Sequence, residues 1–294
     1  MKVEVKNYNV KVGNNLPTQI MISFDSDEQD PVIHFLKGGN MWALDLANAS
    51  SLFWEKGSTI LDIGGHIGTY SLIAASITEN KVIAVEASPQ NFRFLKNNKD
   101  CNGFDNLTVH NVAAGSEEGT LQFTGGGSGG HVLGDQSQNG VEVKCVKLDD
   151  LLGNLEALDF IKMDIEGFEI EAIKGARTLL NKFEPVILFE CNGHTLKFFN
   201  KTPNDLFEIL ENEFGYSLFL LNGGLVQISY KDPFPFGVCD LFALKAKHIG
   251  KVAGYIKQPL TPEDIKKGFE DTRRIGNEDI QRYLDWYIAK QEKI

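Results

Sequence analysis

Short apolar runs alternate with amphipathic stretches from Ser58 onward, a pattern typical of repeated strand–helix–strand units. Most of the runs are almost continuously apolar rather than alternating, as expected for strands that are covered on both faces. The five runs are STILDI (58–63), KVIAVEA (81–87), LTVHNVA (107–113), DFIKMDI (159–165) and PVILFE (185–190). Because crossovers between parallel strands are right-handed, the pattern predicts an α/β fold with a mostly parallel sheet and helices on both faces.

Helix signals fill the gaps between these runs. Small residues mark one face of GHIGTYSLIAASI (65–77), and Ser88 followed by Pro89 is an N-cap with a first-turn proline, which opens QNFRFLKNNK (90–99). After the fourth run, apolar residues recur at helical spacing and predict one further helix. Its apolar stripe consists of Ile165, Ala172, Ile173, Ala176, Leu179 and Leu180.

The rhythm changes after the third run. TLQF (120–123), the Gly/Ser tract GGGSGG (125–130) and VEVKCVKL (141–148) predict an inserted hairpin with Asn139-Gly140 as its turn. We expect the Gly/Ser tract to be a mobile loop that becomes ordered when ligands bind, because six small residues cannot build a core.

Two further runs, YSLFLLN (216–222) and DLFALKA (240–246), have no long helix between them. This spacing predicts an antiparallel hairpin at the edge of the sheet. The sheet then has seven strands, five joined by crossovers and two closing as the terminal hairpin.

Three parts follow from these signals. We expect residues 1–57 to form an N-terminal extension, with a hairpin and a helix at 41–56, that packs on a main domain at 58–247. Residues 248–294 read as a C-terminal helical extension whose polar helices start at Thr261-Pro262-Glu263. Either extension covers the site or mediates the formation of a homo-oligomer.

The composition fits a cytoplasmic globular protein. Apolar residues make up 42% of the 294 and charged residues 23%, and no apolar run reaches the roughly 18 residues of a membrane span. The net charge of −11 argues against nucleic acid as the main partner. The four cysteines lack paired metal spacing, so we expect reduced thiols; they are Cys101, Cys145, Cys191 and Cys239.

The most informative stretch is LDIGGHIG (61–68), which ends the first strand and opens a helix. The dinucleotide order G-x-G-x-x-G fails from both Gly64 and Gly65, which disfavours a dehydrogenase. An acid two residues before the first glycine suits a ligand with a cationic amino-acid tail. Asp62 can then lie near ammonium and sulfonium charges, while the glycine backbone makes room for a methionine moiety. The alternative is a strand–turn–helix junction without a ligand.

Glu86 ends the second strand about 20 residues after the glycine loop, where an acid accepts hydrogen bonds from both hydroxyls of a ribose. Taken alone, it also fits an exposed carboxylate at a strand end. Asp62, the glycines and Glu86 together are more specific than any one of them.

Five blocks of the chain resemble successive blocks of the FkbM-type methyltransferases, a class I family that uses S-adenosylmethionine. They are ILDIGGHIGTYSL, VIAVEASPQNFRFLKNN, VAAG, FIKMDIEGFEIEAIKGA and PVILFE, and they cover roughly residues 57–195. The family often has Ala-Asn where this chain has Gly65-His66. The resemblance implies a Rossmann-like methyltransferase fold and methyl transfer, usually to a hydroxyl on a small molecule, sugar or glycan.

The resemblance also implies where S-adenosylmethionine binds. The residues that we expect to contact it are Asp62, Gly64, Gly65, His66, Gly68, Tyr70, Glu86, Ala87, Ala113 and Asp164.

Three acids follow the fourth strand. Asp164 closes the strand and is also a candidate N-cap, and Glu166 falls in the expected first helical turn. Glu169 lies within the apolar stripe, where a carboxylate needs a partner. We interpret it as an anchor for the glycine loop or a neighbouring backbone segment, with a direct catalytic role as the alternative.

Methyl transfer to a hydroxyl requires a group that helps to remove the acceptor proton. The candidates are Asp164, Glu190, His131 and His194, and we take the first three as the catalytic set. Asp164 and Glu190 could instead hold Mg²⁺, but two carboxylates are no metal signature and no metal is assigned. N- or C-methyl transfer and a non-catalytic binding module are the alternative functions.

Overall fold

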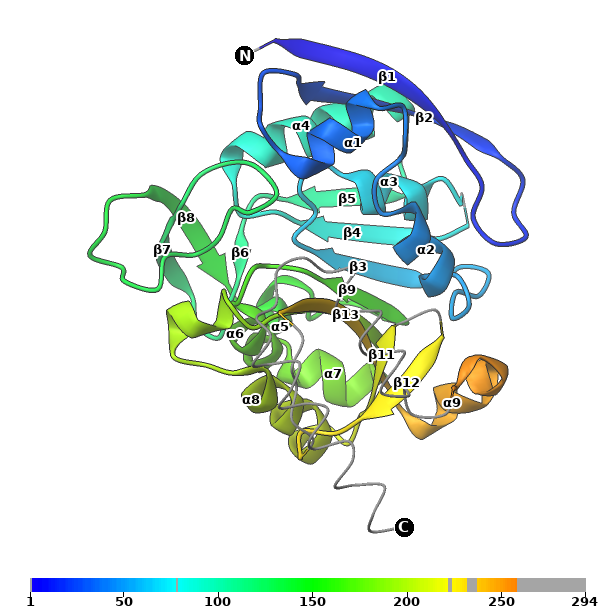
Figure 1. The fold of residues 1–294 in the computed structure, drawn as a ribbon, viewed down its shortest axis with the longest axis vertical. Coiled ribbons are helices and arrows are strands. Elements are labelled where there is room, and N and C mark those ends of the chain that lie inside the picture. The colour runs from blue at the N-terminus through cyan, green and yellow to red at the C-terminus, as the bar shows by residue number, and fades with distance from the viewer. Residues whose placement is uncertain (1, 78, 222–223, 232–236, 258–294) are drawn as a thin grey trace. The chain divides into compact units, whose positions relative to one another are not determined.

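The fold is mixed α/β, as the sequence predicts. The structure is a computed structural model that describes residues 2–77, 79–221, 224–231 and 237–257 (Figure 1). The chain separates into two compact units, Met1–Leu188 and Phe189–Ile294. A mainly parallel sheet of eight strands has the order β12-β11-β13-β10-β9-β3-β4-β5.

Four parallel strands of the first unit carry the glycine loop and the acids that follow the strands. They are β3 (Thr59–Ile63), β4 (Lys81–Val85), β5 (Leu107–His110) and β9 (Phe160–Met163). β3 pairs in parallel with both β4 and β9, and β5 pairs with the far side of β4. Every residue of β3 and β9 is buried. This confirms the prediction that their continuous apolar runs form strands covered on both faces.

The helices that follow β3 and β4 are α3 (Thr69–Ala75) and α4 (Pro89–Asn102). The hydroxyl of Ser88 accepts a hydrogen bond from the backbone N–H of Asn91 at 3.3 Å, which confirms the predicted N-cap of α4. The inserted sheet is followed by the short helix α5 (Leu148–Leu151).

The single helix predicted after β9 is wrong, because two helices, α6 (Glu169–Gly175) and α7 (Arg177–Phe183), take its place. Ala176 between them has a non-helical φ of −111°. Gly175 also lies so close to another segment that a Cβ atom there would come within 1.9 Å of the Gly115 carbonyl oxygen.

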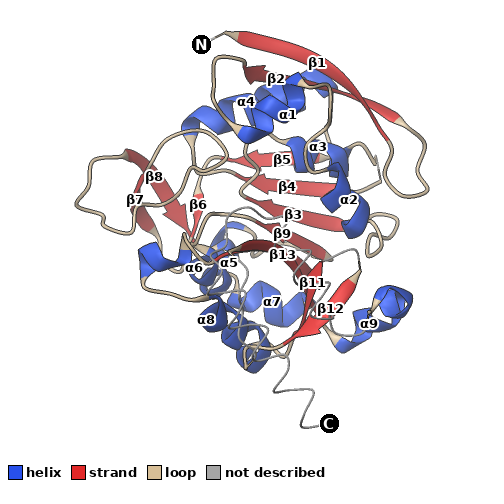
Figure 2. Cartoon of the chain, viewed as in Figure 1, coloured by secondary structure: helices blue, strands red, loops and turns tan. Residues whose placement is uncertain are grey.

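The inserted excursion forms a three-stranded sheet in the order β6-β8-β7. Its strands are β6 (Ala113–Ala114), β7 (Gly119–Phe123) and β8 (Val141–Val146), and β7 pairs with β8 antiparallel as predicted. The expected tight turn at Asn139-Gly140 is wrong, since residues 124–140 form one long connection. In Figures 1 and 2 this sheet lies beyond the arrowheads of β3, β4 and β5.

The predicted strand 107–113 is also divided, because β5 ends at His110 and β6 leaves the central sheet to pair with β8. The Asn111 side chain between them donates hydrogen bonds to the carbonyl oxygens of Glu86 and Ala87 at 2.8 and 3.1 Å. These bonds fix the chain at the point where it leaves the sheet.

The N-terminal segment contains the predicted hairpin, β1 (Val3–Val10) and β2 (Thr18–Asp25). Two short helices follow, α1 (Pro31–Lys37) and α2 (Leu44–Ser50), so the single helix expected at 41–56 is too long. Asn98 on α4 joins β2 to the glycine loop. Its amide accepts a hydrogen bond from the Ser23 backbone N–H at 2.7 Å and donates one to the Ile67 carbonyl oxygen at 2.8 Å.

In the second unit, β11 pairs antiparallel with both β12 and β13. Its pairing with β13 confirms the predicted antiparallel pairing of these two strands. The predicted hairpin between them is wrong in its connection, because β12, an eighth strand that the sequence pattern did not show, follows β11 in the chain and forms the edge of the sheet. The elements from the unit boundary onward are β10 (Val186–Asn192), η1 (Leu196–Phe199), α8 (Pro203–Glu208), η2 (Ile209–Glu213), β11 (Ser217–Leu221), β12 (Leu225–Ile228), β13 (Val238–Leu244), α9 (Ala246–Val252) and η3 (Ala253–Tyr255).

The helices expected from Thr261 onward lie outside the described residues. The domain boundaries after residues 57 and 247 stay predictions. In the part of the chain that the structure describes, no helix combines the length and the apolar character that crossing a bilayer needs.

Candidate functional site

The glycine loop is shaped by close backbone contacts. The N–H groups of Gly64 and Gly65 both donate to the Val85 carbonyl oxygen, at 2.9 and 3.0 Å. Gly64 has a φ of +87°, and a Cβ atom there would lie 1.9 Å from the Asp164 carbonyl oxygen. Gly68 has a φ of +98°, and its Cβ would lie 2.8 Å from a methyl carbon of Leu95. Both positions therefore require glycine.

His66 lies between these glycines in the left-handed region, with a φ of +51°. Histidine and asparagine enter this region more readily than most residues, which explains why His66 can stand where the family often has Asn. Burial lowers the pKa of His66 to about 4, so its imidazole is neutral at pH 7. Its ring Nε2 is buried and has no hydrogen-bond partner among the described residues.

Glu86 follows β4 and is 5% exposed. Its Oε2 accepts a hydrogen bond from the His66 backbone N–H at 2.7 Å, and its Oε1 accepts one from the Ser88 backbone N–H at 2.8 Å. Burial raises the pKa of Glu86 to about 7, and the two N–H groups oppose this rise. The carboxylate thus joins the glycine loop to the start of α4.

A buried ionic cluster joins β3 and β9. Asp62 is fully buried and accepts a hydrogen bond from the Ser71 hydroxyl. Lys162 Nζ lies 3.5 Å from Asp62 Oδ1 and 3.4 Å from Asp164 Oδ2, and it donates to the Gly64 carbonyl oxygen at 3.2 Å. Burial raises the pKa of Asp62, whereas Lys162 and Ser71 act to lower it.

A turn at Glu166-Gly167 precedes α6, and the N-cap position of this helix is Phe168. The expectations that Asp164 is the N-cap and that Glu166 lies in the first turn are therefore wrong. Glu166 has a φ of +52° and Gly167 a φ of +98°. Glu169 is 1% exposed, and its Oε1 accepts hydrogen bonds from the N–H groups of Ile165 and Gly167, both at 3.2 Å. This confirms the interpretation of Glu169 as an anchor for neighbouring backbone. Burial raises its pKa to about 7.

The Gly/Ser tract is hydrogen-bonded at two points. The Asn91 side chain accepts from the Gly127 N–H and donates to the Gly127 carbonyl oxygen, both at 3.0 Å. Asp30, the N-cap of α1, accepts from the Ser128 N–H. Asn91 also lies 3.5 Å from Glu86 Oε1, so the tract is placed beside that carboxylate. Whether ligands order the tract further stays a prediction.

The remaining residues expected at the site have these positions. The Tyr70 hydroxyl is buried and donates to Ser50 on α2 at 2.8 Å. Ala87 follows Glu86, and Ala113 is buried in β6 opposite Cys145. The half-buried His131 has its ring Nδ1 2.9 Å from the Gly129 carbonyl oxygen.

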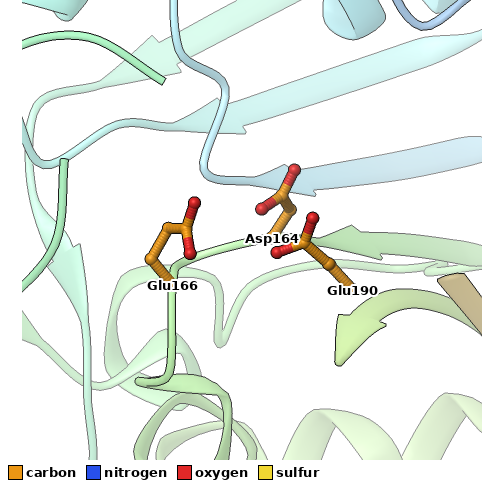
Figure 3. Close-up of side chains that lie close together, drawn as sticks. All are labelled: Asp164, Glu166 and Glu190. Atoms are coloured by element: carbon orange, nitrogen blue, oxygen red, sulfur yellow. The ribbon is translucent and has the colours of Figure 1, made fainter. Parts of the chain in front are cut away.

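Carboxylates that could serve as metal ligands are Asp164, Glu166 and Glu190, drawn in Figure 3. The first two belong to the turn after β9, and Glu190 lies half-buried on β10. Neighbouring acidic side chains are common without an ion, so no metal is assigned. His194, the remaining candidate base, is exposed in the second unit.

The sequence reasoning missed three residues of this site: Lys162, Asn91 and Asp30. A signal for Lys162 existed, since it is a lysine inside an otherwise apolar strand, and a buried lysine needs partners. Asn91 and Asp30 gave no such signal, because their partners are backbone atoms far away in the sequence.

Comparison with solved structures gives distant matches. The FkbM methyltransferase of Methylobacillus flagellatus is 21% identical, with a TM-score of 0.44 over 67% of this chain and 46% of that one. TYW2 of P. horikoshii, in complex with MeSAdo, is 17% identical, with a TM-score of 0.33 over 64% of this chain and 56% of that one.

Sequence comparison identifies the family. Methyltransferase 1 of Beauveria bassiana is 25% identical over 40% of this chain and 58% of its own length. The hexuronic acid methyltransferase AglP of Haloferax volcanii is 26% identical over 46% of this chain and 56% of its own length. The matches thus span little more than half of these relatives. The family model for the methyltransferase FkbM domain matches residues 62–218, more than half of the chain, which therefore belongs to the FkbM methyltransferase family.

Proposed function

We propose that this protein transfers a methyl group from S-adenosylmethionine to a hydroxyl oxygen of a sugar or another small molecule. The observation that carries the proposal is the Glu86 carboxylate, buried directly after β4 and held by the His66 and Ser88 N–H groups. A carboxylate oxygen can accept two hydrogen bonds, so Oε2 can accept one from a ribose hydroxyl beside that from His66. Acids at this position bind ribose in nucleotide-binding α/β sheets.

The ionic cluster fits the other end of the cofactor. Asp62 and Asp164 carry two negative charges against the one positive charge of Lys162. One negative charge is therefore left to attract an ammonium or sulfonium group. The backbone at Gly64 and Gly65 offers a surface without side chains for the methionine moiety. We also propose that the cofactor contacts five further residues: His66, Gly68, Tyr70, Ala87 and Ala113.

When bound, S-adenosylmethionine supplies a methyl group on a positively charged sulfur, so that transfer forms a carbon–oxygen bond and breaks a carbon–sulfur bond. The chain must orient the acceptor hydroxyl and receive its proton. We assign this work to Asp164, whose side chain is 37% exposed at the carboxyl end of β9. Glu190 and His131 are the alternatives.

A sugar acceptor is supported by the similarity to the hexuronic acid methyltransferase AglP. N- or C-methyl transfer and a non-catalytic binding module are the competing functions. Titration calorimetry with S-adenosylhomocysteine and NAD tests the cofactor, and we expect binding of the first only. Transfer of labelled methyl to glycans with and without hexuronic acid then tests the acceptor.

Asp164→Asn keeps the shape of the side chain, so we expect normal folding and a loss of about 10²- to 10⁴-fold in turnover. Glu166→Gln, a change in the same turn, is the matched control. Full turnover in Asp164→Asn would contradict the assigned role. Binding of S-adenosylhomocysteine without methyl transfer to any acceptor would favour the binding module.

A further inference from the structure

In the described part of the first unit, Lys162 is the one buried cation that contacts Asp62, Asp164 and the glycine loop. Lys162 is 7% exposed, and all four residues of β9 are buried. In the parallel register, Lys162 lies opposite Asp62 on the neighbouring strand β3. Burying a lysine is costly unless it is paired, so its place here depends on these partners.

Lys162 contacts three different segments of the chain. Asp62 belongs to β3, the Gly64 carbonyl oxygen to the glycine loop and Asp164 to the turn after β9, at 3.5, 3.2 and 3.4 Å. An ammonium group has three N–H donors, so one side chain can engage all three. The Gly64 backbone also packs directly on Asp164, which leaves the loop little freedom to move at this point.

The charge of Lys162 matters most for Asp62. That carboxylate is fully buried, and burial alone drives it toward its neutral, protonated form. The ammonium group opposes this effect. A neutral Asp62 would still occupy its place in the core, but it would no longer attract a cationic ligand.

We propose that Lys162 is a positioning residue for the amino-acid end of the cofactor, because its ammonium group pairs with Asp62 and holds the Gly64 carbonyl and Asp164 in place. The inference rests on the proposed function, since it assigns Lys162 to one end of that site. Glu86 serves the ribose end, where the His66 and Ser88 N–H groups fix it, and Lys162 is the weakest of the influences on its pKa. The two ends are therefore separable by ligand.

Two probes distinguish the ends. S-adenosylhomocysteine carries the amino-acid tail, whereas 5′-methylthioadenosine has the ribose and base without it. We expect Lys162→Met to weaken S-adenosylhomocysteine binding by about 10- to 100-fold and methylthioadenosine binding by less than about 2-fold. Lys162→Gln keeps a donor for the Gly64 carbonyl but lacks the charge, so its loss should fall between wild type and Lys162→Met.

The pH profile gives a second readout. In Lys162→Met, Asp62 should take up a proton at higher pH, so affinity for S-adenosylhomocysteine should decline on acidification at a higher pH than in wild type. Lys81→Met, on the exposed first residue of β4, is the matched control and should bind both probes as wild type does. If Lys162→Met does not fold, Lys162→Met with Asp62→Asn removes both charges, and the same selective loss is expected.

Each outcome has one meaning. Equal loss of both probes, or no loss of either, in the folded variants overturns the role of Lys162. A wild-type protein that binds neither probe overturns the proposed function itself. A selective loss that Lys81→Met does not share supports the inference.

Discussion

At the scale of single residues, the Glu86 carboxylate has both a structural role and a proposed role in binding. It accepts the N–H groups that fix the glycine loop and α4, and in the proposed function it also accepts a ribose hydroxyl. We expect Glu86→Gln to weaken S-adenosylhomocysteine binding by about 10- to 100-fold, since hydrogen bonds to a charged group are lost.

The pH dependence of that binding follows from the raised pKa of Glu86, about 7. Below this value the carboxyl is protonated and loses its strength as an acceptor. Wild-type affinity, measured by calorimetry between pH 8 and pH 6, should therefore fall on acidification, and Glu86→Gln should lose this contribution. An unchanged pH profile in Glu86→Gln would exclude Glu86 as the titrating group.

Gly64 gives a second prediction at this scale. Gly64→Ala places a Cβ atom 1.9 Å from the Asp164 carbonyl oxygen and strains a φ of +87°, so the loop or β9 must move. We expect a loss of at least about 2 kcal/mol in the free energy of unfolding, measured by urea denaturation. Gly129→Ala is the control, because nothing lies within 4 Å of a Cβ atom there. Equal stability of both variants would show that the backbone contact is easily relaxed.

At the scale of elements, the Gly/Ser tract is held mainly by side chains of neighbouring helices. Asn91→Ala removes both hydrogen bonds to Gly127, so we expect the Gly127 amide to exchange with solvent about 5- to 10-fold faster. Asn97→Ala on the same helix is the control, because its amide bonds Ser23 instead. Hydrogen exchange read by mass spectrometry measures both. Protection of residues 124–134 that is the same in both variants would show that the tract does not depend on Asn91.

Elements defined by local sequence could be predicted. Residues that are neighbours in the sequence determine the Ser88-Pro89 cap of α4 and the apolar runs of β3, β4, β9 and β10. The division of 107–113 could not be predicted, because the Asn111 side chain bonds carbonyl groups more than 20 residues away. The break between α6 and α7 likewise involves a close approach of Gly115 to Gly175.

The candidate site likewise contains residues that the sequence predicts and residues that it does not. The glycine loop, Glu86 and the acids after β9 follow from the rule that parallel strands end at one edge of a sheet. Lys162 was missed because its significance lies in its pairing with Asp62, which depends on the register between β3 and β9. The turn at Glu166 was missed because Glu169 reaches back to the N–H groups of Ile165 and Gly167.

At the scale of the whole molecule, buried acids make stability depend on pH in an unusual direction. Burial raises the pKa of Glu86 and Glu169 to about 7, above the ordinary value of 4.5 in the unfolded chain. A group with a raised folded-state pKa stabilises the protein fully below its unfolded pKa, and this contribution is lost as the pH rises through the folded value. These two residues therefore favour folding more at pH 5 than at pH 8.

Other groups limit the effect on the acid side. His66, with a pKa lowered to about 4, favours folding above pH 6.5, and this contribution is lost as the pH falls from 6.5 toward 4. Asp25 and Asp30 have lowered pKa values and favour folding above their ordinary value of 3.8. His110 also has a lowered pKa and acts as His66 does, whereas Glu28 and Asp62 have raised pKa values and act as the two glutamates do. Between pH 6.5 and pH 4.5 these four acids outnumber the two histidines. Stability should therefore rise on acidification from pH 8, reach a maximum near pH 5 and then fall.

Urea denaturation at pH 8, 6.5, 5 and 3.5 measures this curve. Glu169→Gln carries an amide in the same place, which can still accept the N–H groups of Ile165 and Gly167 but does not titrate. We expect it to approach wild-type stability at pH 5, where the wild-type carboxyl is protonated, and to exceed it at pH 8, by about 1–3 kcal/mol. A wild-type protein that loses stability steadily from pH 8 to pH 5 would contradict the prediction. A Glu169→Gln curve parallel to wild type would contradict only the part assigned to Glu169.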